Sequence, residues 1–247
     1  MKVVLLAAGK SQRIFKKINK NKCLLKINKN TIIENSINEI LKAKVKLKDI
    51  IVVLGFKPNL IKKELKKYKK IKFILNKNYN SSEMLYSLIF ALRKYNSDVI
   101  FAYTDIIFSH KTINKIIKSD KKNIAIPVLS NWKKIWKIRN KDPYDDAESL
   151  LVNDGRLTSI GQKIKKLSKI KYQFMGITFI PQSKRKKVLN FYNTTKVKKN
   201  LHLTTFLNKL AKHRFKINCI KISDNWYEFD DYSDYLNYRK HYKKKIN

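Results

Sequence analysis

The chain has only two cysteines, Cys23 and Cys219, among its 247 residues. Two thiols give no sign of a disulfide framework, and we therefore expect a protein of the reducing cytoplasm. Long apolar runs are missing as well, since no stretch approaches the ~20 residues that a membrane helix needs. The short apolar beginning ends in Gly-Lys-Ser-Gln-Arg without a cleavage-like site, which argues against a signal peptide. We expect no insertion into a membrane.

Acidic residues are scarce, because 18 Asp and Glu stand against 57 Lys and Arg, a formal net charge of +39. Such a charge suits a nucleic acid or an anionic membrane surface. The lysines are spread over the whole chain, however, which favours a background of composition on solvated faces. We expect no specific nucleic-acid partner. A nucleic-acid-binding protein stays open as an alternative, which a basic stripe with stacking aromatic residues would favour.

The chain does contain an alternation of apolar strands and helical segments. Thr31 is placed to cap a helix whose apolar residues include Ile33, Ile37 and Ile40. Such alternation indicates βαβ units and predicts an α/β fold, with a single Rossmann-like, doubly wound and mostly parallel sheet. We expect one domain over residues 1–247, with an inserted hairpin or lid region over about 128–165 and a C-terminal helix over about 231–245. Further strands are expected over 49–54, 71–75, 98–104, 171–180 and 215–220, and further helices over 59–67, 184–192 and 203–212.

The first apolar strand runs into a loop of small residues. Ala7, Ala8 and Gly9 let backbone N–H groups approach a ligand closely, as in loops that hold phosphates. Arg13 and Lys22 add positive charge where a polyphosphate would lie. Ligands of doubly wound sheets bind at the carboxyl ends of the strands, where this loop is expected. The alternative in so lysine-rich a chain is an ordinary strand and loop with basic residues nearby.

Two later segments carry groups that suit a nucleotide and its counter-ion. Residues 76–88 form a polar loop that runs into a helix, and their hydroxyl and amide groups suit a base and ribose or, equally, a plain helix N-cap. Asp105 follows the apolar strand over 98–104. A carboxylate at the end of a central strand is costly unless it meets a cation, although a capping or solvated Asp is the alternative.

The regular alternation ends at Ser130, where aromatic and acidic residues gather. Trp132 and Trp136 are two of the three tryptophans, and Asp146 and Glu148 belong to an acidic cluster that is rare in this basic chain. These residues suit a cationic amine through cation–π and ion-pair contacts. They equally suit the packing of a lid, and both interpretations stay open.

Together these segments resemble the sugar-phosphate nucleotidyltransferase superfamily. Residues 6–13 and 22–24 are similar to its signature Leu-Ala-Ala-Gly-x-Ser-x-Arg followed by Lys-x-Leu, with Asn21 where proline is usual. Residues 132–148 resemble a narrower group, the cytidylyltransferases of phosphocholine, phosphonate and capsule-modification pathways. Glu228-Phe229-Asp230 resembles the closing Glu-Ile-Asp motif of the superfamily.

The resemblance implies a role for each matching residue. The residues implied to be catalytic are Arg13 and Lys22. The carboxylates implied to hold Mg²⁺ are Asp105 and Asp230, with Asp231 in place of Asp230 if the register differs by one. The nucleotide contacts are implied at Leu6, Ala7, Ala8, Gly9, Ser11, Asn80, Ser82, Ser87 and Tyr103. The acceptor contacts are expected at Trp132, Trp136, Arg139, Asp146, Glu148 and Lys163.

The chemistry that the resemblance implies is Mg²⁺-dependent nucleotidyl transfer, with CTP favoured, a small phosphorylated acceptor and release of pyrophosphate. The implied acceptors are phosphocholine, 2-aminoethylphosphonate, an amino-acid-amide phosphate, or a polyol or sugar phosphate. A phosphate that is already ionised needs no general base, which fits four scattered histidines. The alternatives are a sugar-1-phosphate nucleotidyltransferase that uses UTP or dTTP, and a nucleotide-sugar-dependent glycosyltransferase, which the basic signature disfavours. A homo-oligomer is left open.

Overall fold

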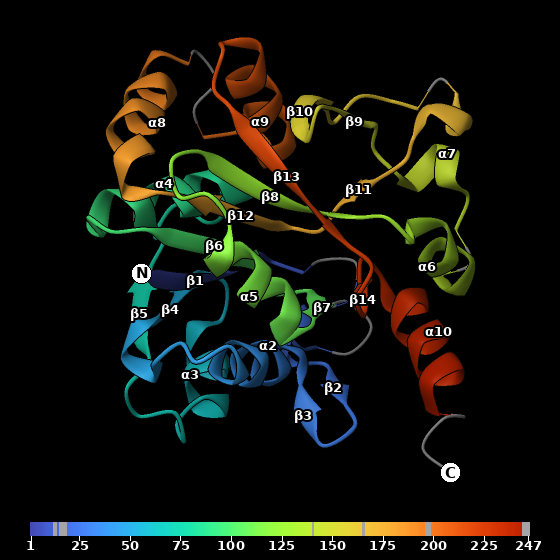
Figure 1. Cartoon of the computed structure of the whole chain (residues 1–247). Coiled ribbons are helices and arrows are strands. Elements are labelled where there is room, and N and C mark those ends of the chain that lie inside the picture. Colours follow the sequence, from blue (N-terminus) through green and yellow to red (C-terminus); the bar gives the residue numbers. More distant parts are fainter. Residues whose placement is uncertain (12–13, 15–18, 140, 165, 196–198, 244–247) are drawn as a thin grey trace.

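A computed structural model describes residues 1–11, 14, 19–139, 141–164, 166–195 and 199–243 of the chain (Figure 1). Most of its strands join one large sheet. They are β1 (Lys2–Ala7), β4 (Ile50–Leu54), β5 (Lys72–Leu75), β6 (Val99–Tyr103), β8 (Ile124–Leu129), β9 (Leu150–Asn153), β10 (Arg156–Ile160), β11 (Gln173–Phe174), β12 (Ile177–Ile180) and β13 (Ile217–Ile222). Two small sheets pair β2 (Lys26–Ile27) with β3 (Asn30–Thr31), and β7 (Ile106–Phe108) with β14 (Trp226–Glu228).

The large sheet has the order β5-β4-β1-β6-β12-β8-β13-β10-β9, and β11 pairs with β8 beside this path. Strands β5, β4, β1 and β6 run parallel, as do β8 and β13, whereas β12 is antiparallel to both of its neighbours. The carboxyl ends of β1 and β6 therefore meet at one edge of the sheet. The prediction of an α/β fold with a mostly parallel, doubly wound sheet is confirmed.

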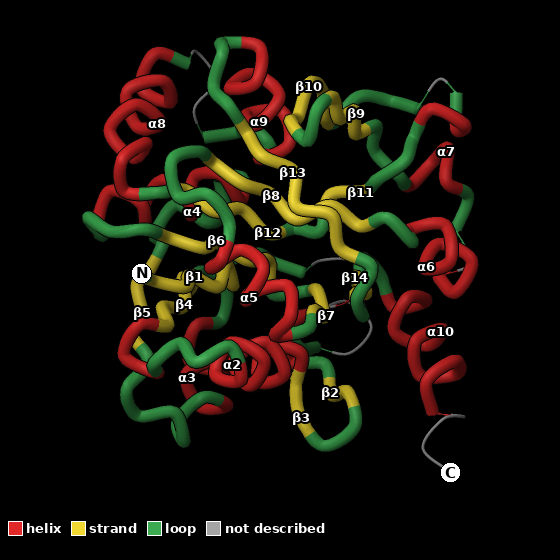
Figure 2. The backbone as a smooth tube through the Cα atoms, in the orientation of Figure 1, coloured by secondary structure: helices red, strands yellow, loops and turns green. Residues whose placement is uncertain are grey.

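Helices cover both faces of this sheet (Figure 2). In Figure 1, α2 and α3 lie below the strands and α8 and α9 lie above them. The helices are α2 (Ile32–Lys42), α3 (Pro58–Glu64), α4 (Met84–Lys94), α5 (His110–Lys118), α6 (Trp132–Arg139), α7 (Pro143–Asp146), α8 (Gln182–Thr194), α9 (Leu203–Lys212) and α10 (Tyr232–Lys243). Short 3₁₀ turns lie at η1 (Lys22–Leu24), η2 (Leu47–Asp49) and η3 (Leu167–Lys169). Among the described residues, none of these helices has the length and apolar character that crossing a bilayer requires.

The core is split by the sheet into two layers, and β1 contributes to both. Val3 and Leu5 pack with α2 and α5 on one face, whereas Val4 and Leu6 pack with α4 on the other. Because successive side chains of a strand point to opposite faces, a strand buried on both sides is an uninterrupted apolar run. Thr31 caps α2 through a capping box with Glu34, which confirms the predicted helix start.

One part of the predicted architecture comes out differently in detail, and another is confirmed. The strand expected over 171–180 is broken into β11 and β12, because Gly176 lies between them with a φ of +71°. A Cβ at that glycine would come within 2.8 Å of Tyr103, so the backbone packs directly on this ring. The hairpin expected within about 128–165 is confirmed as β9 and β10, which turn at Asp154-Gly155 and form one end of the large sheet.

Candidate functional site

The loop after β1 is held in place by its own polar side chains. Ser11 has a φ of +54°, and its hydroxyl accepts a hydrogen bond from the backbone N–H of Lys22 at 3.0 Å. This contact ties η1 to the loop and directs the lysine side chain over the sheet edge. The predicted catalytic residue Arg13 lies outside the described residues.

Two glycines near this loop have opposite surroundings. A Cβ built at Gly9 would meet no atom of the described residues within 4 Å, apart from its two neighbours in the chain. A Cβ at Gly55 would lie 2.5 Å from the carbonyl oxygen of Ala8 and 2.6 Å from the Cβ of Tyr79. Packing within the chain therefore requires glycine at position 55. Among the described residues, none packs against position 9 in a way that would require glycine there.

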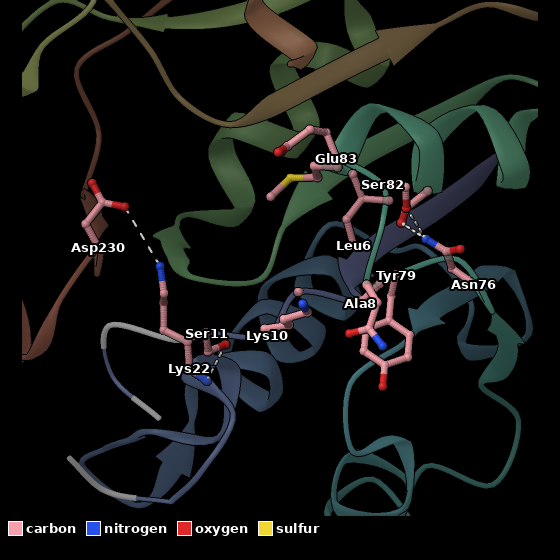
Figure 3. Close-up of a pocket in the computed structure, with 14 residues that line it drawn as sticks. Leu6, Ala8, Lys10, Ser11, Lys22, Asn76, Tyr79, Ser82, Glu83 and Asp230 are labelled. Atoms are coloured by element: carbon pink, nitrogen blue, oxygen red, sulfur yellow. Dashed lines mark hydrogen bonds and ion pairs between the residues drawn. The ribbon is translucent and has the colours of Figure 1, made fainter. Parts of the chain in front are cut away.

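Lys22 meets two carboxylates that come from distant parts of the chain. Its Nζ lies 3.0 Å from Asp105 Oδ2 and 3.8 Å from Asp230 Oδ1. The pairing of β7 with β14 explains the meeting, since Asp105 precedes β7 and Asp230 follows β14. The N–H of Phe229 also donates to the carbonyl of Asp105 at 2.9 Å. Figure 3 shows Lys22 directed toward Asp230.

A third carboxylate, Glu228, belongs to the same group. It lines a cavity together with Asp105, Asp230 and Lys22. Burial raises the pKa of Glu228 well above 4.5, and the nearby Asp230 and Asp105 raise it further. Burial alone would lower the pKa of Lys22, but the attraction of Asp105 and Asp230 outweighs it and the pKa is raised. Among the described residues, these three carboxylates face two cations, Lys22 and Arg139. Sequence reasoning assigned no role to Glu228, although it is the Glu of the Glu-Ile-Asp-like motif.

Asp230 and Asp231, the two candidates for the second metal-binding carboxylate, differ in their surroundings. Asp230 lines the cavity beside Asp105. Asp231 instead accepts the backbone N–H of Asp234 at 3.1 Å in the first turn of α10, and it pairs with Lys141 at 3.2 Å. An Asp that satisfies a free N–H at the start of a helix acts as an N-cap. The geometry favours Asp230 as the carboxylate that faces a ligand.

Three cavities of about 470, 280 and 360 Å³ adjoin one another along the carboxyl edge of the sheet. We name them the nucleotide-side, central and acceptor-side cavities. All three share Met84 and Asp230 in their walls, so they form one continuous cleft. The predicted nucleotide contacts lie along it: Leu6, Ala7, Ala8, Gly9, Ser11, Asn80, Ser82 and Ser87 line the nucleotide-side or the central cavity, and Tyr103 lines the central and acceptor-side cavities.

The far wall of the nucleotide-side cavity is a hydrogen-bonded loop (Figure 3). Asn76 is buried and donates to the hydroxyls of Ser82 at 3.3 Å and Ser87 at 3.0 Å. Its own carbonyl oxygen accepts the N–H of Asn78 at 2.9 Å. Asn76 therefore shapes the loop that carries the predicted contacts, a role that sequence reasoning missed although the residue opens the same polar segment.

The acceptor-side cavity is walled by the aromatic and acidic residues expected there. Trp136, Asp146 and Glu148 line it, together with Phe174 and Gln173 from β11. The protein around Glu148 partly desolvates its carboxylate and raises its pKa, and a hydrogen bond from Thr204 at 3.3 Å opposes that rise. Lys163 is exposed and is not among the described residues that line the three cavities.

The two tryptophans differ in their surroundings. Trp132 is 1% exposed and meets Trp136 edge-on, with ring centroids 5.5 Å apart. Trp136 stacks on Trp226 at 6.2 Å with 10° between the ring planes. For Trp132 this favours the packing alternative, because the ring is enclosed by protein. Trp136 combines packing on one side with a place in the cavity wall.

Arg139 lies beneath the cavity wall and has no exposed side-chain atoms. Its guanidinium contacts Asp146 at 3.1 Å, Asp230 at 3.1 Å and Asp234 at 3.0 Å. This position does not favour the acceptor contact expected from the sequence, because the charge is enclosed and already balanced by carboxylates.

Comparisons with known proteins extend these observations. Residues 3–167 match the family model of the MobA-like NTP transferase domain. Over 249 aligned residues the chain is 27% identical to a CTP:phosphoglutamine cytidylyltransferase of Campylobacter jejuni, covering 95% of this chain and 97% of that protein. The structure of an inositol-1-phosphate CTP transferase from T. maritima matches with a TM-score of 0.78 at 18% identity, over 94% of this chain and 90% of that one. A CTP:phosphocholine cytidylyltransferase from Streptococcus pneumoniae matches with a TM-score of 0.73 at 17% identity, over 97% and 98%.

The family match covers two thirds of the chain and includes the glycine loop, Lys22 and Asp105. The remaining part supplies Asp230 through the pairing of β14 with β7. The two solved structures have low sequence identity to this chain, and they show that its fold is the same as theirs over nearly its whole length. The chain belongs to the MobA-like NTP transferase domain family and is a nucleotidyltransferase.

Proposed function

We propose that this protein transfers a cytidylyl group from CTP to a small phosphorylated acceptor that carries an amine, with Mg²⁺ and with release of pyrophosphate. The observation that carries the proposal is the continuous cleft, in which Asp230 is shared by a nucleotide-side and an acceptor-side cavity. Such a shared wall lets two substrates meet at one point. The preference for CTP is supported by the curated relative, which is a cytidylyltransferase.

The nucleotide side offers what a nucleoside triphosphate needs. The open space at Gly9 leaves the loop backbone accessible to phosphate oxygens, and Lys22 lies beside it. The hydroxyl and amide groups of Asn80, Ser82 and Ser87 line the same cavity and suit the edges of a base. We therefore place the base against the loop before α4 and the phosphates along the loop after β1.

Magnesium fits the donors that the chain presents at the sheet edge. Asp105 Oδ1 is buried and has no hydrogen-bond partner in the part of the chain that the structure describes. Among the described residues, no three or more His, Cys, Asp or Glu side chains converge as a metal site. Mg²⁺ usually takes one or two carboxylates and completes its shell with phosphates and water. We assign Asp105 and Asp230 as its ligands, and the bound metal would neutralise charge on the triphosphate.

The reaction is a displacement at the α-phosphorus of CTP. An oxygen of the acceptor phosphate or phosphonate forms the new P–O bond, and the bond to the β-phosphate bridging oxygen breaks. Pyrophosphate leaves with that electron pair. The attacking oxygen is already ionised at neutral pH, so no proton has to be removed. The contribution of the chain is to position the two substrates and, through Lys22, to stabilise charge that moves onto the leaving group.

The acceptor side suits a positively charged group. Asp146, Glu148 and Glu228 line its cavity together with Trp136. A cationic amine can form ion pairs in such surroundings. Phosphocholine and 2-aminoethylphosphonate have this chemistry, and phosphoglutamine, the substrate named for the curated relative, also has an amino group.

The experiment is a measurement of pyrophosphate release over four nucleoside triphosphates and a panel of acceptors. The panel contains phosphocholine, 2-aminoethylphosphonate, an amino-acid-amide phosphate, inositol 1-phosphate and hexose 1-phosphates. We expect turnover only with added Mg²⁺, and the highest kcat/KM with CTP and an amine-bearing acceptor. Faster turnover of UTP or dTTP with a hexose 1-phosphate than of every CTP pair would contradict the proposal.

A further inference from the structure

Arg139 is the last residue of α6 and its side chain is completely enclosed. The guanidinium carbon lies 4.9 Å from the ring centre of Trp136, which covers one side of it. The backbone carbonyl of Arg139 accepts a hydrogen bond from Asn237 of α10 at 2.8 Å. The residue is thus fixed at both ends, between the acceptor-side segment and the C-terminal helix.

The guanidinium distributes its donors among carboxylates of different segments. Nε donates to Asp234 Oδ1 at 3.0 Å, and Nη2 donates to Asp230 Oδ2 at 3.1 Å. Nη1 lies 3.1 Å from Asp146 Oδ2 and 3.7 Å from Glu228 Oε2. The planar fork of arginine can serve several acceptors in fixed directions, which the point charge of a lysine cannot do.

Asp230 is held from more than one direction as a result. Its Oδ2 faces Arg139, its Oδ1 faces Lys22, and its backbone N–H donates to Asp234 Oδ2 at 2.8 Å. Asp234, which is also completely buried, therefore holds both Asp230 and the arginine. The direction in which the Asp230 carboxylate faces the cleft depends on this arrangement.

We infer that Arg139 is a positioning residue that sets the orientation of Asp230 for metal binding and links it to the acceptor-side wall through Asp146. The inference rests on the proposed function, because it concerns the metal that Asp230 would hold. Residues that orient a metal ligand without touching the metal have effects on metal affinity of about 10- to 100-fold. A role in packing alone would change stability and leave metal affinity as it is.

Lys141 supplies a matched control. It pairs with Asp146 at 3.3 Å and with Asp234 at 3.2 Å, so it belongs to the same cluster of charges. The direct partners described for Lys141 are Asp146, Asp231 and Asp234, whereas Asp230 acts on it through the attraction of its charge, which helps to raise the pKa of Lys141. Lys141→Met therefore disturbs the cluster without removing the contact that the inference depends on, whereas Arg139→Lys keeps the charge and loses the fork.

The experiment measures Mn²⁺ binding by electron paramagnetic resonance, with a non-reactive CTP analogue present and without acceptor. Thermal unfolding of each variant is recorded beside it. We expect Arg139→Lys to weaken Mn²⁺ binding about 10- to 100-fold and Lys141→Met to leave it unchanged, even where both lower the melting temperature. Raising the Mg²⁺ concentration should restore turnover in Arg139→Lys. Equal Mn²⁺ affinity in the wild type and Arg139→Lys, or an equal loss in both variants, would overturn the inference.

Asp234→Asn provides a second route if Arg139→Lys does not fold. This substitution weakens the contacts that Asp234 makes with the guanidinium of Arg139 and with the backbone N–H of Asp230. A larger loss of Mn²⁺ affinity than in Lys141→Met supports the inference. An equal effect in the two variants overturns it. Mn²⁺ binding is independent of the acceptor. Failure of the whole acceptor panel would therefore count against the proposed function alone, whereas a wild type that binds no Mn²⁺ would overturn both.

Discussion

The two ends of the cleft differ in charge. The nucleotide-side cavity has Lys10 and Lys22 in its wall, beside the carboxylates of Glu83 and Asp230. The acceptor-side cavity has no lysine or arginine among the described residues that line it, although the chain has 57 of them. Five of the 18 acidic residues gather there instead: Glu83, Asp146, Glu148, Glu228 and Asp230.

The two charge patterns differ in how much they reveal. In a chain with a net charge of +39, lysines beside a loop are what the background provides anywhere. Their presence at the nucleotide side is therefore weak support unless geometry adds to it, as it does at Lys22. A concentration of carboxylates runs against that background and against their mutual repulsion. It calls for a cationic occupant, whether a metal, a substrate amine or a buried arginine.

The largest effects are expected at Asp105 and Asp230, the carboxylates of the central cavity, where the two sides of the cleft meet. We expect Asp105→Asn and Asp230→Asn each to lower kcat by about 10³-fold or more, because each removes a carboxylate that would hold the Mg²⁺ that neutralises charge on the transferring phosphates. Pyrophosphate release measures the effect, and thermal unfolding checks the fold. Asp231→Asn is the neighbouring control, and its side chain is occupied by α10 and Lys141. If it abolished activity while Asp230→Asn did not, the assignment would be wrong by one residue.

A substitution of Lys22 tests the nucleotide side of the cleft. Its ammonium lies between Asp105 and Asp230, where the metal is proposed to bind. We expect Lys22→Met to lower kcat/KM for CTP by about 10²- to 10³-fold. The same variant should bind Mn²⁺ more tightly than the wild type when no nucleotide is present, because a competing cation has been removed. Weaker Mn²⁺ binding in Lys22→Met would show that the ammonium supports the metal site and does not compete with it.

Substitutions at Gly9 and Gly55, near the loop after β1, distinguish an effect on ligand binding from an effect on packing. Gly9→Val should leave the melting temperature unchanged and lower kcat/KM for CTP about a hundredfold, since the new side chain displaces the phosphates. Gly55→Ala should instead destabilise the fold by about 1–3 kcal/mol, because its Cβ meets Ala8 and Tyr79. Thermal unfolding and CTP kinetics on both variants make the comparison. A destabilised Gly9→Val with normal CTP kinetics would mean that the open space has no ligand.

The architecture could be predicted where burial alone decides it. The apolar runs of β1 and β4 are buried on both faces. The apolar residues of α2 recur at helical spacing, and Thr31 caps the start of this helix. No strand was predicted over Ile124–Leu129, although β8 lies in the middle of the sheet. Pro127 lies within it and lacks an N–H for the ladder, so the local sequence argues against a central strand. Pairing with β12 and β13, which are distant in sequence, overrides that preference.

The site was predictable to the extent that its groups follow strands. Asp105 ends an apolar strand, and the small residues of the first loop follow another. The environment of Arg139 was not accessible in this way, because its partners Asp146 and Asp234 lie on different elements and meet only in the folded chain. A basic residue in a basic chain carries no local sign that it will be buried among carboxylates.

The smallest expected effect concerns Glu148 in the acceptor-side cavity and the pH dependence of the acceptor KM. The pKa of Glu148 is raised above 4.5, so the carboxylate gains its proton as the pH falls through a range above that value. A protonated Glu148 no longer attracts a cation, and we expect the KM for 2-aminoethylphosphonate to rise toward acid pH in the wild type. Glu148→Gln should raise this KM about tenfold at neutral pH and remove that part of the pH dependence, while the KM for CTP stays the same.

Ethylphosphonate is the matched acceptor for this measurement, because it has the same phosphonate and no amine. The phosphonate titrates in both compounds, and comparing their KM profiles therefore isolates the contribution of the amine. We expect Glu148→Gln to leave the KM for ethylphosphonate unchanged. If the variant raised the KM of both acceptors equally, Glu148 would act on the phosphonate or on the cavity wall, and the carboxylates of the acceptor-side cavity would need another cation as their occupant.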